Sequence, residues 1–259
     1  MTRPRAALLA LVLLAPIPLL GAATAMVWFP ESAAAKALFA LAKVLLMLAP
    51  LAWLLKVDKT KPGLPRWHGD PASDLRGFRG FRRFRQSGML AAHLTGGAIF
   101  LAIAVAYYGF AQHWIDVGPM REKIVQMGLD NLWLYLAGAL YWCTINSLLE
   151  EYFWRWFIFS CLRDVLPKST FGITTAIVLC ALLFTAHHVV ALSVYFDWTT
   201  TLLASAGVFI GGTTWSLLYL RYRNIWACYV SHVYPDVIIF FIGYQLIFTA
   251  PGISPAPGT

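Results

Sequence analysis

Acidic, basic and imidazole side chains recur at helical spacing inside three apolar stretches of this sequence. In the first stretch, Glu151 directly follows Glu150, and Arg155 stands four residues after Glu151. Residues four apart share a helical face, so Glu151 and Arg155 can form an ion pair. Glu150 points about 100° away from that face, which leaves its carboxylate available for acid–base chemistry.

Imidazoles occupy the other two stretches. His187 and His188 are adjacent, and neighbouring helical residues point in different directions. We therefore expect at most one of them to face Glu150. His232 and Asp236 are four apart and share a helical face.

Pro235 interrupts the hydrogen bonding of the last stretch. It has no amide hydrogen, so the carbonyl of Ser231 loses its helical partner. Within a membrane such an opening is tolerated only beside protein or a watery cavity. A charged group in mid-membrane is also costly, and we find such groups in these three runs only. The sequence therefore predicts that the three polar segments meet at one site.

The elements that carry these residues are predicted to be membrane-spanning helices. The 259 residues are 59% hydrophobic and 12% charged, whereas roughly a quarter of a soluble domain is charged. A span of about 30 Å needs roughly 20 helical residues. The fold class is therefore predicted to be all-α, a polytopic bundle with seven spans and a range of six to eight. The runs are Ala6–Phe29, Ala34–Leu55, Met89–Phe110, Leu132–Glu150 with its extension, Phe171–Tyr195, Thr201–Leu220 and Ile225–Phe248.

The first run resembles a cleavable signal peptide at its start, but it is long enough to span, and we expect a retained helix. The four cysteines lie in or beside apolar runs without a CxxC pair, which predicts free thiols.

Basic residues predict the orientation of the bundle. Nine of the 20 Lys and Arg lie between Lys56 and Arg85, which indicates a cytoplasmic loop, 56–88, and a cytoplasmic N-terminus. The clusters at 163–168 and 221–223 fall on the same side. Because the basic residues share no soluble domain, a nucleic-acid partner is disfavoured. Phe78, Phe81 and Phe84 lie three apart among arginines, so this loop either binds anionic lipid at the membrane surface or is a solvated linker.

Depth in the membrane gives a partial check on the predicted site. Glu150 lies some 15 residues before the inner turn near Lys168, and His188 some 20 after it, which are roughly similar heights. His232 lies about eight residues beyond its own inner turn, which is shallower by roughly 10 Å. The heights agree only if the turn before Lys168 projects beyond the membrane.

Three motifs follow one another in the chain: EExxxR at Glu150, FxxxH ending at His188 and HxxxD starting at His232. In type and order they resemble the motifs of the CAAX-protease and bacteriocin-processing (CPBP, or ABI) family of intramembrane endopeptidases. The resemblance covers Leu132–Phe248. Residues 1–130 lie outside it and are predicted from the apolar runs to form N-terminal helices with the basic loop. The predicted protease core then covers 131–250, and the flexible tail covers 251–259. Trp156 stands where many members have glycine, and Asp236 where asparagine is common.

The resemblance implies a peptidase acting on a membrane-anchored protein or peptide. Glu150 would activate a water shared with His188, and His232 with Asp236 would stabilise the oxyanion. Asp236 would have to be protonated, or would orient His232, because an ionised carboxylate donates no hydrogen bond. Glu151 and Arg155 would hold the site together electrostatically.

Three alternatives stay open. A zinc-dependent peptidase would use Glu150, His188 and His232 as ligands, but no HExxH motif is present, and the metal-free form without a cofactor is favoured. A proton-coupled transporter also buries such groups, although no internal repeat is visible. A non-catalytic scaffold or immunity protein could share the same fold.

Overall fold

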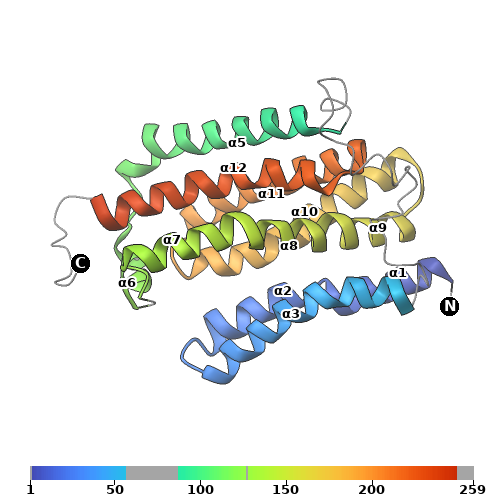
Figure 1. Ribbon diagram of the computed structural model, residues 1–259, viewed down its shortest axis with the longest axis horizontal. Helices are drawn as coiled ribbons and strands as arrows, with labels where there is room; N and C mark the ends of the chain where they lie inside the picture. Colours follow the sequence, from blue (N-terminus) through green and yellow to red (C-terminus); the bar gives the residue numbers. More distant parts are fainter. Residues whose placement is uncertain (1, 57–86, 127, 250–259) are drawn as a thin grey trace.

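The computed structural model describes residues 2–56, 87–126 and 128–249. These residues are 87% helical and contain no strand. The helices lie side by side along one long axis (Figure 1). The all-α prediction is confirmed.

Within the described residues, seven helical segments are long and apolar enough to cross a membrane, as predicted. Two of them, the α1–η1 segment and α3, form a hairpin that lies beside the rest of the bundle in Figure 1. The short elements η2 (Ala111–His113) and α6 (Gly118–Gln126) connect the third and fourth spans. The spans are α1 (Arg3–Leu14) with α2 (Ile17–Ala22) and η1 (Ala23–Trp28); α3 (Ala33–Lys56); α5 (Met89–Gly109); the segment Leu132–Val165; α10 (Thr170–Ser193); α11 (Trp198–Tyr222); and α12 (Ile225–Tyr244) with η5 (Gln245–Thr249).

The fourth span is the longest, with 34 residues, or about 50 Å at 1.5 Å per residue. It therefore exceeds a hydrocarbon core of about 30 Å. Its α-helical pieces alternate with π-helical turns, which widen the backbone locally and often occur at functional sites. The pieces are α7 (Leu132–Tyr141), η3 (Trp142–Asn146), α8 (Ser147–Glu151), η4 (Tyr152–Ile158) and α9 (Phe159–Val165).

Polar caps set where the last four spans begin. The side chains of Asn131, Ser169, Asp197 and Asn224 accept hydrogen bonds from the first amides of α7, α10, α11 and α12. Each cap satisfies donors that the first helical turn leaves unpaired. At Asp197, hydrogen bonds from the Thr200 hydroxyl and amide lower the pKa of the carboxyl below 3.8.

Helix α12 packs along α5 at the proline-freed carbonyl. A side chain at Gly96 of α5 would lie 3.0 Å from the Ser231 oxygen and 2.6 Å from the Tyr234 ring, so only glycine permits this approach. The Ser231 hydroxyl also contacts the Thr95 hydroxyl at 2.9 Å and accepts from the Trp215 indole at 3.2 Å. The freed carbonyl therefore lies beside protein, one of the two settings predicted for it.

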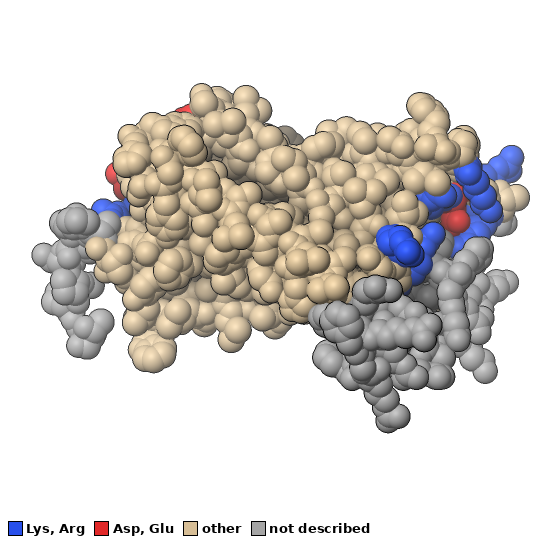
Figure 2. Space-filling view, turned by 90° about the horizontal axis from the view of Figure 1, so that it is seen from above, with Lys and Arg blue, Asp and Glu red and all other residues tan. Residues whose placement is uncertain are grey.

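Residues other than Lys, Arg, Asp and Glu make up most of the visible face, and lysines and arginines gather mainly at one end of it (Figure 2). This end holds the start of α1 and the end of α9 (Figure 1), which the 2.9 Å ion pair of Arg3 and Asp164 joins. The four cysteines are free and buried, as predicted. Residues 57–86 of the basic loop, with Phe78, Phe81 and Phe84, and the tail 251–259 lie outside the described residues.

Candidate active site

The predicted ion pair of Glu151 and Arg155 is present and buried. Arg155 Nη1 lies 3.3 Å from Glu151 Oε1, and both side chains have 0% exposure. The guanidinium also lies 4.4 Å from the Phe184 ring centroid and 5.0 Å from that of Trp215. Cation–π contacts of this kind strengthen when they are shielded from water. The pair therefore joins the fourth span to α10 and α11.

Glycine at position 212 brings α11 close to this pair. Arg155 Nη2 donates to the Gly212 carbonyl at 3.3 Å. A side chain there would meet Arg155 and Phe184 at 3.3 Å. The missing side chain lets the guanidinium reach the backbone of α11.

His232 is held by the same carboxylate. Its Nδ1 lies 2.7 Å from Glu151 Oε1, and because an ionised carboxylate only accepts, Nδ1 donates this hydrogen bond. The imidazole stacks on Trp215 with ring centroids 3.8 Å apart. Its Nε2 lies 3.7 Å from Glu150 Oε2. One face of the site is thus a chain from Arg155 through Glu151 and His232 to Glu150.

Glu150 lies where the fourth span, α10 and α12 meet. Its Oε1 accepts a 2.9 Å hydrogen bond from Asn146 Nδ2 and lies 4.0 Å from His187 Nε2. The carboxylate is 19% exposed, whereas Glu151 beside it is fully buried. Of the two neighbouring acids, Glu150 is thus the accessible one and Glu151 the buried, ion-paired one.

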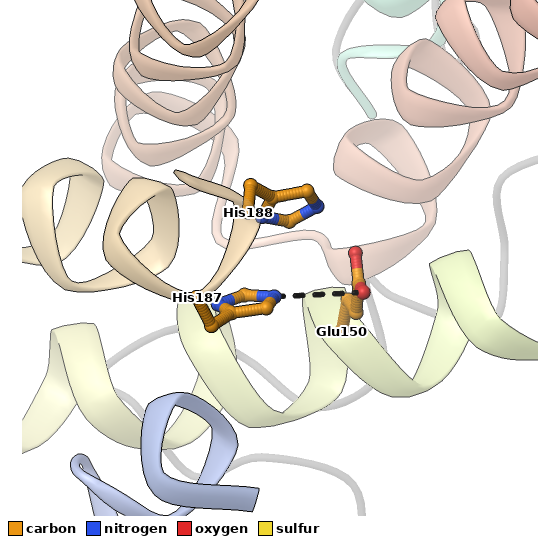
Figure 3. Close-up of side chains that lie close together, drawn as sticks. All are labelled: Glu150, His187 and His188. Carbon is orange, nitrogen blue, oxygen red and sulfur yellow. Dashed lines mark ion pairs between the residues drawn. The ribbon is translucent and has the colours of Figure 1, made fainter. Parts of the chain in front are cut away.

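Both adjacent histidines face Glu150, so the expectation of at most one was wrong. Ligand atoms of Glu150, His187 and His188 lie within 4.8 Å of one another, and both rings lie on the side of α10 nearest Glu150 (Figure 3). Residues about 100° apart on one helix can both reach a group that lies between their directions. His187 is held by stacking on Trp154, with the ring planes 3° apart.

His188 has a defined tautomer when neutral. Its Nδ1 lies 3.0 Å from the Phe184 carbonyl, which only accepts, so Nδ1 donates and Nε2 carries the lone pair. The unprotonated nitrogen of His188 can therefore accept a proton or contact a water.

Asp236 joins the site from α12 through Ser147. The Ser147 hydroxyl donates to Asp236 Oδ2 at 2.5 Å, and Asp236 Oδ1 lies 3.9 Å from His232 Nε2. The short contact that orients the His232 ring comes from Glu151.

The sequence interpretation missed four residues around these acids. Asn146 and Ser147 precede Glu150 by four and three residues, so helical spacing could have pointed to them. Lys43 is a charged residue inside an apolar run, and the statement that only three runs carry such groups was wrong. Its Nζ lies 3.4 Å from Asn146 Oδ1. The fourth, Trp215, gave no signal, because a tryptophan in an apolar run is ordinarily a packing residue.

The predicted difference in depth between His232 and Glu150 is absent, since their side chains approach to 3.7 Å. The 34-residue fourth span explains this agreement. A span of this length can project beyond a hydrocarbon core of about 30 Å, which is the condition under which the two heights agree.

Part of the chain matches a known protein family. Residues 131–238 match a family model described as type II CAAX prenyl endopeptidase Rce1-like. No curated protein matches the chain, and no solved structure does. The matched region contains Glu150, His187, His188, His232 and Asp236 on the fourth span, α10 and α12. Residues 131–238 are therefore an Rce1-like type II CAAX prenyl endopeptidase domain, consistent with a CPBP family intramembrane protease.

Proposed function

We propose that this chain is an intramembrane endopeptidase that hydrolyses a peptide bond of a membrane-associated protein or peptide, with Glu150 as general base. One observation carries the proposal: a partly accessible carboxylate lies among imidazoles from two other spans, with His232 Nε2 at 3.7 Å and His187 and His188 beside it. Such groups are costly in a membrane, and where they occur they commonly mark a functional site.

Glu150 and His188 activate the attacking water in this mechanism. The carboxylate takes the water proton as the oxygen attacks the scissile carbonyl, and His188 Nε2 accepts a hydrogen bond from the same water. The proton then passes to the leaving amine. The Nδ1–Phe184 hydrogen bond keeps the His188 lone pair directed at the water throughout.

His232 stabilises the oxyanion. Its Nδ1 donates to the Glu151 carboxylate, and when the ring carries a second proton its Nε2–H donates to the developing charge. Arg155 balances the charge of Glu151, so the pair orients His232 without adding net charge. Asp236, held by Ser147, lies beside Nε2 and donates to the oxyanion only when protonated.

Cleavage of a membrane-tethered reporter with a prenylated CAAX tail tests this proposal. We expect Glu150→Gln to lower kcat by about 10²–10⁴, because the amide cannot take a proton while its size is unchanged. The exposed acid Glu31 provides the control, Glu31→Gln. Cleavage by Glu150→Gln at the wild-type rate, with equal amounts in the membrane, would reject the mechanism. Absence of cleavage by the wild-type chain would instead favour a scaffold or transport role.

A zinc-dependent version is the second candidate, because three donors cluster within 4.8 Å. Glu150, His187 and His188 would hold the ion, with His187 in place of the His232 expected from the sequence. Zinc would supply a Lewis acid that activates the bound water. Metal content by mass spectrometry, together with chelator treatment and zinc restoration, separates the two versions: the metal-free form predicts no stoichiometric zinc and no loss of activity.

We also propose that the N-terminus and the basic loop 56–88 are cytoplasmic and that this loop contacts anionic lipid. The gathering of lysines and arginines at one end supports this orientation (Figure 2).

A further inference from the structure

Lys43 is a cation that the N-terminal hairpin places next to the candidate active site. It lies on α3, outside the matched residues 131–238. Its ammonium lies 5.2 Å from the Phe39 ring centroid and 4.9 Å from that of Trp142. These contacts favour a cation between the two rings, and together with Asn146 they fix where the ammonium lies.

Asn146 connects this cation to the proposed general base. It is buried, with 9% exposure; its Oδ1 faces Lys43 Nζ at 3.4 Å and its Nδ2 donates to Glu150 Oε1 at 2.9 Å. An ammonium has only donors and an ionised carboxylate only acceptors. A flipped amide would oppose donor to donor and acceptor to acceptor, so the two charged neighbours permit one orientation.

We propose that Lys43 is a positioning residue for the hydrolysis, acting through Asn146 on Glu150. It fixes the Asn146 amide, which restrains Glu150 Oε1 and leaves Oε2 directed toward His232. The inference rests on the proposed function and extends it, since the hairpin then completes the site.

Docking of α3 on the fourth span has other supports. The Tyr152 hydroxyl donates to the Met47 carbonyl at 3.1 Å, and Trp53 packs edge-on against Phe157 with centroids 6.1 Å apart. Removing the charge of Lys43 leaves these contacts in place. A functional effect can therefore be separated from loss of the hairpin.

Kinetics of the full chain in lipid nanodiscs, with the CAAX-tailed reporter, test the proposal. We expect Lys43→Met to lower kcat about tenfold to a hundredfold, the effect of losing a charge-assisted hydrogen bond, with KM unchanged. Lys43→Arg should retain most of the activity because it keeps the cation between the rings. Lys36→Met, at an exposed position of the same helix, is the matched control and should behave as wild type.

A double-mutant cycle tests the route through Asn146. In an Asn146→Leu background, Lys43→Met should cause no further loss, and an additive loss would overturn the route. If Lys43→Met does not accumulate in the membrane, Lys43→Gln removes the charge with less change in polarity, and the same fall in kcat is expected.

The outcomes separate this inference from the proposed function. Wild-type kcat in the Lys43 variant, alongside an inactive Glu150→Gln, would overturn the role of Lys43 alone. A raised KM with unchanged kcat would also overturn it. An active Glu150→Gln would instead overturn the proposed function.

Discussion

At the scale of single residues, the site separates two neighbouring acids by their surroundings. Glu151 has its charge balanced by Arg155 in a fully buried pair, while Glu150 keeps partial access and an amide partner. A buried pair is a weak source of net stability, but breaking it leaves an uncompensated charge. The pair orients His232 through Glu151, and removal of either partner alone should destabilise the protein.

Removing one partner tests this reading. Arg155→Met should destabilise the protein by about 3–5 kcal/mol, because Glu151 is left buried and unpaired. Arg155→Met combined with Glu151→Gln should recover part of that loss, since neither charge remains. Thermal unfolding in detergent measures both effects, and equal unfolding temperatures for wild type and Arg155→Met would contradict the structural role.

The adjacent histidines separate the two mechanisms. In the metal-free mechanism, His188→Ala should lower kcat by about 10²–10⁴, and His187→Ala should cost less because His187 has no assigned proton transfer. In the zinc mechanism, either substitution would remove a ligand and lower the bound zinc. Reporter kinetics together with metal analysis decide between these patterns, and equal losses with lost zinc would contradict the metal-free form.

At the scale of helices, spacing predicted most of what was found. Four-residue spacing predicted the Glu151–Arg155 pair, and long apolar runs predicted seven spans. The cross-helix contacts were not predictable, because a pattern within one helix carries no information on which neighbour it meets. His232 is an example: its short contact is to Glu151 on another span, although Asp236 is its neighbour on the same helix.

The helix caps give a prediction that depends on pH. The lowered pKa of Asp197 means that its charge stabilises the folded state above the ordinary value of 3.8, and that this contribution is lost as the pH falls through the lower folded-state pKa. Asp197→Asn keeps a capping oxygen but removes the charge. Its unfolding temperature should fall below that of wild type at neutral pH.

The difference in unfolding temperature between wild type and Asp197→Asn should shrink at acidic pH. Glu31→Gln removes one exposed carboxylate elsewhere and serves as the control. A difference between wild type and Asp197→Asn that stays constant as the pH falls would contradict the assignment to the Asp197 charge.

At the scale of the whole molecule, composition alone predicted the membrane fold, since so few charged residues cannot coat a soluble domain. Motif order predicted the family of residues 131–238. The contribution of the N-terminal hairpin could not be predicted in this way. Lys43 belongs to no motif, and only the packing of α3 against the fourth span brings it to Asn146.

The proposed orientation can be measured with single cysteines, because the four native thiols are buried. In intact cells, an impermeant maleimide should label Glu31→Cys and leave Lys168→Cys unlabelled until the membrane is opened. The reason is that basic turns stay in the cytoplasm. The reverse pattern would contradict the orientation.

Peptide hydrolysis that depends on Glu150 can be measured inside the membrane without choosing a substrate. New protein termini in membranes that contain the wild-type chain are identified by mass spectrometry and compared with those in membranes that contain equal amounts of Glu150→Gln. If Glu150 is the general base, a set of termini should appear with the wild type and be missing with the variant. Identical termini in both membranes would contradict it.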